Sequence, residues 1–480
     1  MKESEFPPAF ERSSMSIPLS VQNYLDAQNI NYGVEHNPQL MPITHIGNED
    51  KLDLACVARL VLLKDELGKV QVIFPKNCLL DISAVNELLG RELRAINNDD
   101  LSAFGEDSQL EQTPAIPLLE NFPLLADNQL FTTDEVFLES GIANTYVKLN
   151  QEQFRKTLGN ADLAKFSEPI EPILKQLLAT DDEQDLTNAV KNFTTLRIKS
   201  RLDETLEIPP LPDSADRIIK LRVDANATVE DLAKVVEMDP SLAAQVVSWA
   251  SSPFYSAPGE IRSIEDAIVR VLGFDLVINL ALGLALGKSL SLPKDGPQGI
   301  TPYWDQAVLT AVTMDQLGKL IPPAARPTSG LTYLSGLLNN FGYLILAHIF
   351  PPHFSLISRY AEANSHTASN IIDRHVLGVS REQIGSWLMN MWNLPKEIVT
   401  ALRWQHTPNY QGEYSQYANL LCVTNQLLSP HLSHYGPLDP LPNELFERLQ
   451  LDQEEAKLVL EKILEKSDDL KAMSQELSKN

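Results

Sequence analysis

Cysteine is scarce in this sequence, which contains only three in 480 residues. Cys56, Cys78 and Cys422 are widely spaced, and no two of them form a CxxC pair. Their number and spacing exclude a disulfide framework and a cysteine-based zinc cluster, and they favour a reducing compartment. We expect all three thiols to be buried as small apolar side chains.

Basic residues are outnumbered: Lys and Arg total 39, Asp and Glu total 64, and the formal net charge is −25. A surface this acidic repels nucleic-acid phosphate and anionic lipid, so we expect neither DNA nor a membrane among the partners. No run of basic residues indicates a local exception.

Long apolar runs are also missing. The longest, Leu276–Leu286, is interrupted by Gly283 and is too short to span a bilayer. The N-terminal MKESEFPPAF has acidic residues where a signal peptide has basic ones, and no apolar segment follows it. These features predict a cytoplasmic protein.

The length of 480 residues and the apolar fraction of 44% predict a globular protein of more than one domain. We predict an N-terminal α/β domain, a mixed sheet with helices, followed by an all-α domain. The predicted segments are a disordered lead-in (1–19), the α/β domain (20–155), a helical acidic linker (156–207), the all-α domain (208–430) and a helical tail (431–480).

The α/β prediction depends on a change of pattern after the first short helix. Val57–Leu63 and Lys69–Phe74 are apolar strands separated by a turn, and Ile142–Leu149 is another strand. Asp81–Gly90 has the pattern of a helix that ends at a glycine.

The linker contains the acidic stretch DDEQD and ends before Pro209-Pro210, where a helix cannot continue. Beyond the prolines the start signals are those of helices. Thr228 with Asp231 and Ser380 with Gln383 resemble capping boxes, and no strand pattern occurs between residues 211 and 430. The tail carries apolar residues in a charged helix, and we expect this helix to pack against the domain.

The six residues LLNNFG, Leu337–Gly342, lie within an apolar stripe with helical spacing. We predict a single helix here whose buried face consists of Leu334, Leu337, Leu338, Phe341 and Ile345.

The all-α segment resembles the HDOD family, the catalytically silent relatives of HD-type metal phosphohydrolases. The resemblance covers roughly residues 208–430 and rests on five motifs in order. They are PPLPDSADRI, DPSLAAQVVSWASSPFY, IRSIEDAIVRVLGFD, the LLNNFG helix and IGSWLMNMWNLP.

The resemblance implies where metal ligands would lie in a catalytic relative: a His, a His-Asp pair and a later Asp. The matching positions here are Gln306, Asn339 with Asn340, and Asn425, which are all amides. An amide is a poor ligand for a hard divalent cation and cannot supply the charge that acidifies a bound water. We therefore predict no catalytic residue, no metal and no cofactor in this degenerate pocket. His406, whose neighbour is Gln405, is expected to be structural or exposed.

Residues 20–155 are similar to the YbaK-type aminoacyl-tRNA editing domains. The similarity rests on LDAQNINYGVEHNP, the strand ARLVLLKD and the segment LDISAVNELLGRELRAINNDDL. In active members a lysine of that strand helps to position the acyl-ester end of the tRNA, and the matching residue here is Arg59. A later glycine-containing segment shapes their pocket, whereas the segment here, Leu110–Leu119, has no glycine.

Charge also argues against tRNA as the partner of this domain. Residues 1–150 contain 10 Lys and Arg and 23 Asp and Glu, a net charge of 10 − 23 = −13. A domain that docks the acceptor end of a tRNA normally has a basic footprint. We therefore interpret Arg59 as a structural ion-pair residue.

The leading hypothesis is a non-catalytic regulatory protein of bacterial signalling, which binds a partner protein through its HDOD-like domain. The candidate surfaces are the Trp304 segment, Ser251–Tyr255 and the tail helix. The alternative is an aminoacyl-tRNA deacylase that uses the N-terminal domain. A cyclic-dinucleotide phosphodiesterase is a second alternative, disfavoured because the metal ligands are missing.

Overall fold

The structure is a computed structural model, and it consists of two compact units. The first comprises residues 1–175 with 362–365, and the second comprises residues 176–361 and 366–480. The predicted lead-in up to residue 16, the linker beyond residue 189 and Pro209 lie outside the described residues. The structure describes residues 17–36, 53–96, 110–119, 121–178, 182, 184–189, 210–257, 259–290, 293, 295–298, 300–432, 436 and 441–478.

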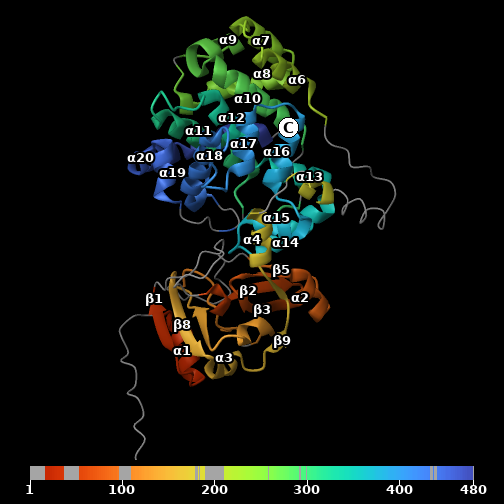
Figure 1. The fold of residues 1–480 in the computed structure, drawn as a ribbon, viewed down its shortest axis with the longest axis vertical. Coiled ribbons are helices and arrows are strands. Elements are labelled where there is room, and N and C mark those ends of the chain that lie inside the picture. The colour runs from red at the N-terminus through yellow and green to blue at the C-terminus, as the bar shows by residue number, and fades with distance from the viewer. Residues whose placement is uncertain are drawn as a thin grey trace, which may run out of the picture. The chain divides into compact units, whose positions relative to one another are not determined.

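The first unit is a mixed sheet flanked by helices, as predicted (Figure 1). Its strand order is β1-β8-β7-β2-β3-β6-β9, with β5 paired to β2, while β4 and β10 form a separate pair. The elements are α1 (Leu19–Ala27), β1 (Gly33–His36), β2 (Val57–Asp65), β3 (Gly68–Pro75), β4 (Cys78–Leu80), α2 (Ile82–Leu89), β5 (Arg94–Ala95), β6 (Leu124–Asp127), β7 (Glu135–Glu139), β8 (Thr145–Asn150), α3 (Gln151–Leu158), β9 (Asp162–Ala164), β10 (Ser167–Pro169) and α4 (Glu171–Leu178).

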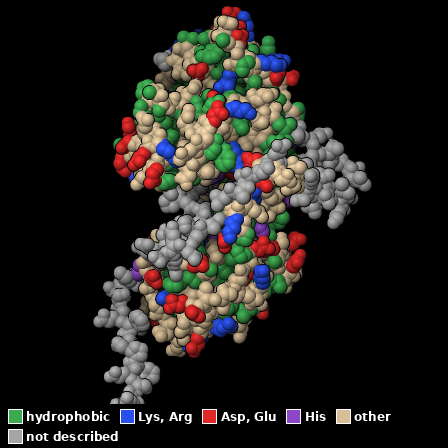
Figure 2. All heavy atoms as spheres, viewed as in Figure 1, with side chains coloured by type: hydrophobic (Ala, Val, Ile, Leu, Met, Phe, Trp, Pro, Cys, Tyr) green, Lys and Arg blue, Asp and Glu red, His purple; other side chains and the backbone are tan. Residues whose placement is uncertain are grey.

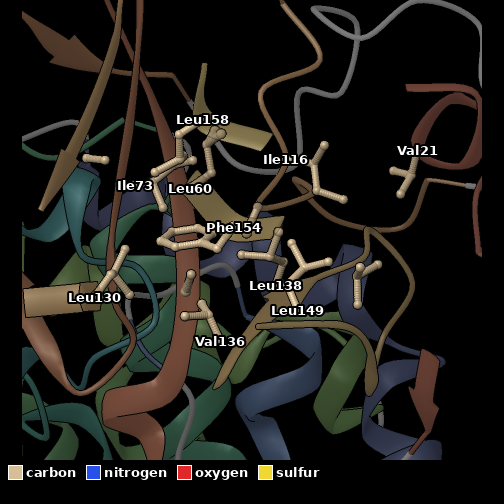
Figure 3. Packing of buried hydrophobic residues seen from close by; sticks show 14 of the residues in the cluster. Val21, Leu60, Ile73, Ile116, Leu130, Val136, Leu138, Leu149, Phe154 and Leu158 are labelled. Atoms are coloured by element: carbon tan, nitrogen blue, oxygen red, sulfur yellow. The ribbon is translucent and has the colours of Figure 1, made fainter. Parts of the chain in front are cut away.

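The predicted hairpin of the first unit is confirmed as the antiparallel pair β2 and β3. Its turn is held by Asp65, whose Oδ1 accepts hydrogen bonds from the backbone N–H groups of Leu67 and Gly68 at 2.8 and 3.1 Å. Leu60 of β2 and Ile73 of β3 are both fully buried. They lie in one apolar cluster with Phe154 of α3 (Figure 3).

The linker begins later than the sequence predicts. Residues 162–164 and 167–169, assigned to it above, are the strands β9 and β10. β9 pairs in parallel with β6, and β10 pairs with β4. Each of these strands has only three residues, which is too few to form a periodic pattern in the sequence.

The second unit is helical throughout its described residues, which confirms the all-α prediction. In Figure 1 the helices α10, α11, α12, α17 and α18 lie together in its middle. The helices are α6 (Asp213–Arg222), α7 (Val229–Glu237), α8 (Pro240–Ala250), η4 (Pro253–Tyr255), α9 (Ile264–Asp266), η5 (Ala267–Leu272), α10 (Phe274–Gly287), α11 (Tyr303–Leu320), α12 (Ser329–Leu337), α13 (Phe341–Ile349), α14 (Pro351–Ala363), α15 (Ser369–Leu377), α16 (Arg381–Met391), α17 (Lys396–Trp404), α18 (Ser415–Leu428), η6 (Ser429–His431), α19 (Asn443–Leu449), α20 (Gln453–Leu464) and α21 (Ser467–Ser478).

Both predicted capping boxes are present. The side chains of Thr228 and Ser380 accept hydrogen bonds from the backbone N–H groups of Asp231 and Gln383, whose own side chains bond back to the cap residues. Each box satisfies two backbone donors that the first turn of a helix leaves unpaired.

The tail forms three helices, α19, α20 and α21, where the sequence predicted one. Leu445, Leu449, Ile463 and Leu470 are buried, and α20 and α21 pack against α11. Acidic side chains gather over α19 and α20 on the face seen in Figure 2. The tail is therefore a packed part of the second unit.

The expectations about the cysteines and about membrane-spanning helices can be compared with the described residues. All three cysteines are free and buried. No helix in the described part of the chain combines the length and apolar character needed to cross a membrane.

Candidate functional site

The asparagines of the LLNNFG motif lie in a turn between two helices, so the prediction of one continuous helix is wrong. α12 ends at Leu337, α13 begins at Phe341, and residues 338–340 form the turn. The apolar spacing did not reveal this break, because the stripe residues before the turn, within it and after it are all buried. Asparagine has a low helix propensity, since its side chain competes for backbone hydrogen bonds.

Gln405 connects two of the predicted amide positions. Its side chain is buried; Nε2 donates to the backbone oxygen of Asn339 at 2.8 Å, and Oε1 accepts from Asn425 Nδ2 at 3.0 Å. We call Asn339, Gln405 and Asn425 the amide cluster. Asn339 Oδ1 is buried and has no hydrogen-bond partner among the described residues.

The other two predicted positions are bonded elsewhere. Gln306, near the start of α11, donates from Nε2 to the backbone oxygen of Thr301 at 2.6 Å. Asn340 caps α13 without a side-chain hydrogen bond, although its backbone oxygen accepts from Tyr343 N at 3.0 Å. No hydrogen bond among the described residues joins either amide side chain to the amide cluster.

A charged pair lies next to the cluster in sequence. His406 Nε2 is 3.5 Å from Glu382 Oε1, and Glu382 is buried at the start of α16. Burial alone would raise the pKa of Glu382, but His406 and Arg381 outweigh it and lower that pKa to about 2. His406 is thus the partner of a carboxylate, a structural role of the kind expected from the sequence.

The described part of the acidic linker is bound to helices of the second unit. Asp182 accepts from Arg403 Nε at 2.5 Å and Nη2 at 2.6 Å, and from Gln383 Nε2 at 2.8 Å. Asp185 accepts from Arg374 Nη2 at 2.6 Å. We call these five residues the linker anchor. Burial would raise the pKa of Asp182, but its hydrogen bonds and the charge of Arg403 lower it.

The donor set of the amide cluster has little in common with that of a metal site. The amide cluster offers neutral oxygen and nitrogen atoms, and its members bond to one another or to backbone carbonyls. Within the described ranges, no three His, Cys, Asp or Glu side chains come together in an arrangement that could hold a metal. Hard divalent ions require anionic oxygen or imidazole ligands.

The first unit contains a buried charged cluster around Glu139, at the end of β7. Glu139 is 2% exposed and accepts a hydrogen bond from Lys76 Nζ at 2.7 Å; Arg59 Nη1 lies 3.3 Å from its Oε2. Lys76 Nζ also lies 5.9 Å from the centroid of the Tyr146 ring. We call these four residues the Glu139 cluster.

The strand register explains why these four residues meet. Ala58 of β2 pairs in parallel with Leu138 of β7, so Arg59 and Glu139 follow at the same level of the sheet. Glu139 pairs with Tyr146 of β8, and Lys76 follows the end of β3. Burial would raise the pKa of Glu139, but the charges of Lys76 and Arg59 lower it. The same carboxylate raises the pKa of Lys76 despite burial.

A glycine does lie against segment Leu110–Leu119, although the segment itself contains none. Gly141 accepts hydrogen bonds at its backbone oxygen from Glu111 N and Gln112 N, at 2.8 and 3.1 Å. A Cβ atom on Gly141 would lie 2.5 Å from Leu110 Cδ2, and its φ of +98° favours glycine. Gly141 lies outside the segment in sequence, so the composition of Leu110–Leu119 could not reveal it.

Two functional candidates were missed from the sequence. Lys76 carries no motif signal, because it is an isolated lysine after a strand. Gln405 was noted only as the neighbour of His406. Its position one residue before that histidine was the available signal.

The comparisons with known proteins support both the architecture and the family. Residues 208–408 match the family model described as HDOD domain. A solved structure from Marinobacter aquaeolei VT8, provisionally named as a signal transduction protein, is 39% identical; the match covers 97% of this chain and 100% of that one, with a TM-score of 0.84.

Two more distant proteins are also similar to parts of the chain. An uncharacterized protein of Treponema pallidum (strain Nichols) is 23% identical over 268 residues, or 55% of this chain, and the match spans about half (51%) of the length of that relative. A solved structure named provisionally as a trans-editing enzyme for prolyl tRNA synthetase is 17% identical, covers 32% of this chain and 99% of its own, and has a TM-score of 0.24.

Proposed function

The chain belongs to the HDOD domain family, and from that premise we propose that it is a regulatory protein of signal transduction that binds a partner protein without catalysis. The provisional name of its relative from Marinobacter aquaeolei supports the signalling role. The main support for a role without catalysis is the hydrogen bonding of Gln405. Its side chain bonds to the Asn425 side chain and to the backbone oxygen of Asn339.

The amide cluster supports the proposal through its chemistry. A metal phosphohydrolase needs ligands that concentrate negative charge around the cation and so lower the pKa of a bound water. Asn339, Gln405 and Asn425 are neutral, and hydrogen bonds already use part of their capacity. Such a cluster stabilises the helix packing rather than a reaction.

The partner surface is expected on the exposed helices of the second unit. Trp304 is only 6% exposed, so the Trp304 segment is not the exposed surface that the sequence suggested. Val223 and Met238 are the more exposed candidates, at 79% and 62%. They follow α6 and α7, which contact each other, and both side chains are apolar and exposed to solvent.

The test combines metal analysis with partner binding. Elemental analysis of the purified full chain is expected to show no stoichiometric iron or manganese, and added manganese should not give hydrolysis of bis(p-nitrophenyl) phosphate. A partner protein retained by the full chain should lose binding to the Val223→Asp/Met238→Asp variant and keep it with Asn425→Ala. Stoichiometric metal with hydrolysis, or the absence of any retained partner under signalling conditions, would refute the proposal.

A second function, aminoacyl-tRNA hydrolysis by the first unit, is favoured by one observation. The Glu139 cluster contains a lysine, Lys76, although the position expected for the lysine is Arg59. The full chain should be assayed on a panel of mischarged tRNAs beside Arg59→Ala and Lys76→Ala. Hydrolysis above background that either variant abolishes would establish this activity; equal background rates would exclude it.

A further inference from the structure

The second unit contains a groove outside the amide cluster, formed by η4, η5, α10, α11, α12 and the tail helix α20. Its volume is about 690 Å³, within the range of small-molecule sites. All of these elements belong to one compact unit. The site therefore does not depend on how the two units are placed.

One wall of the groove is both apolar and basic. Val459, Lys462 and Ile463 lie on the same face of α20 because they are spaced at i, i+3 and i+4, and Lys466 follows in the turn after the helix. The stems of the two lysines cover apolar surface while their ammonium groups remain in solvent.

Both ammonium groups are available to an anion, although Lys466 Nζ also donates a hydrogen bond to the backbone oxygen of Phe254 at 3.4 Å. No carboxylate lies within 4 Å of Lys462 or Lys466 Nζ in the described part of the chain. Lys457, on the same helix, instead forms an ion pair with Glu454 at 2.7 Å, and Lys319, also in the groove, pairs with Asp315 at 2.7 Å. Glu465 is the only acidic residue among those that line the groove. In a chain of net charge −25, two unneutralised lysines at one groove form a local site for an anion.

A second part of the lining is aromatic. Phe254 and Tyr255 pack edge to face with ring centroids 5.1 Å apart, and both line the groove. Lys466 Nζ lies 5.3 Å from the centroid of Phe254, so the positive charge and the aromatic face are adjacent. This arrangement fits a ligand that combines a flat ring with a phosphate.

A third part of the lining belongs to a π-helix. Val271 and Leu272 belong to η5, which has π-helical hydrogen bonding over Ala267–Leu272. Short π-helical segments are rare and are found frequently at functional sites. The π-helix is therefore an independent indication that the groove is a functional site.

We propose that this groove binds a nucleoside phosphate, with the phosphate at Lys462 and Lys466 and the base against Phe254. The amide of Gln316, which also lines the groove, offers hydrogen bonds to the edge of the base or to the sugar. The hydroxyl of Ser329 donates to Asp315 at 2.5 Å, so its oxygen can still accept one. Binding here joins the tail helix to η4 and η5. The site is separate from the amide cluster and from the Glu139 cluster.

The test is isothermal titration of the full chain with AMP, GMP, CMP and UMP. At least one should bind saturably with a dissociation constant of about 1 mM or less. Lys462→Ala and Lys466→Ala should each weaken that binding about tenfold, because a charged hydrogen bond is lost. Lys457→Ala, on the same helix, is the matched control and should leave the affinity unchanged.

Two further measurements test the contribution of Phe254 to nucleotide binding. Phe254→Ala should weaken nucleotide binding, and inorganic phosphate alone should bind more weakly than the nucleotide. Circular dichroism of each variant verifies its fold; the lysines are exposed, so their replacement should not unfold the chain. The proposal is overturned if none of the four nucleotides binds, if Lys457→Ala weakens binding as much as Lys462→Ala, or if phosphate alone binds equally well.

Discussion

Arg403 holds Asp182 in a two-point hydrogen bond, from Nε to Oδ2 at 2.5 Å and from Nη2 to Oδ1 at 2.6 Å. This geometry uses the planar fork of the guanidinium, which a lysine cannot reproduce. The acidic linker is thus attached to α17 at a specific position.

Arg403→Lys should release the described linker residues from α17. Hydrogen exchange of the backbone amides between residues 184 and 189 should become about tenfold faster, because the linker loses part of its anchor. The matched control is Arg262→Lys, whose ion pair with Glu260 is exposed on both sides. Unchanged exchange in Arg403→Lys would contradict a role of this pair in holding the linker.

The free energy of unfolding of the second unit should depend on pH because of Glu382. Its pKa is lowered from 4.5 to about 2 in the folded protein, so its contribution is present above pH 4.5 and is lost as pH falls towards 2. The full contribution is about 3 kcal/mol, since one pKa unit corresponds to about 1.4 kcal/mol. In urea unfolding, wild type and Glu382→Gln should differ most at pH 5 and progressively less at pH 4 and 3. A difference that stays constant over this range would show that Glu382 does not titrate in this way.

Gln405→Leu should destabilise the amide cluster. The substitution removes the acceptor of Asn425 Nδ2 and a donor to the backbone oxygen of Asn339. Leaving these buried polar groups unpaired should lower the free energy of unfolding by about 1–3 kcal/mol. Gln306→Leu is the control, because the half-buried Gln306 side chain donates to the backbone oxygen of Thr301 and, among the described residues, makes no hydrogen bond to the amide cluster. Urea unfolding followed by circular dichroism should separate the two; equal effects would mean that the cluster has no special contribution.

Glu139→Gln should destabilise the first unit by about 3 kcal/mol. The change leaves Lys76 and Arg59 partly buried without their counter-charge. Glu135→Gln on the same strand removes an exposed pair with Lys148 and should cost less than about 1 kcal/mol. Thermal unfolding of both variants gives the comparison, and a smaller shift for Glu139→Gln than for Glu135→Gln would refute the assignment.

Gly342→Ala should weaken the packing of α13 on α16. A Cβ atom at this position would lie 2.0 Å from the backbone oxygen of Arg381, so the two helices must separate. Overpacking of this kind costs about 1–3 kcal/mol. At Gly33 a Cβ would meet only Lys148 Cβ at 3.8 Å, so Gly33→Ala is expected to be nearly neutral in the same unfolding measurement.

Much of the fold could be predicted from local sequence signals. The strands around Arg59, the capping boxes at Thr228 and Ser380 and the helical second unit all follow from patterns within a few residues. The break after Leu337 could not be predicted. Two consecutive helices whose apolar residues face the same core can show the same apolar spacing in sequence as a single continuous helix. The strands β9 and β10 are too short to show a pattern.

The candidate site was harder to predict, since it depends on contacts distant in sequence. Asn339 and Asn425 are joined only through Gln405, and the bond between Gln405 and Asn425 links two separate helices. Lys76 joins Glu139 because of strand register, which a single sequence does not reveal. The sequence singled out these amide positions as a prediction, but it could not show which of them meet.

The packing of α21 against α11 has a consequence for the order in which the chain can fold. α11 ends at Leu320, yet its partner helix spans Ser467–Ser478, so the ribosome must add well over a hundred residues before the two can meet. Until then, the side of α11 that packs against α21 lacks this cover; in the folded unit, Leu470, Met473 and Leu477 of α21 are buried. The second unit can therefore complete its core only after α21 has been synthesised, and apolar surface exposed in that interval is prone to aggregation.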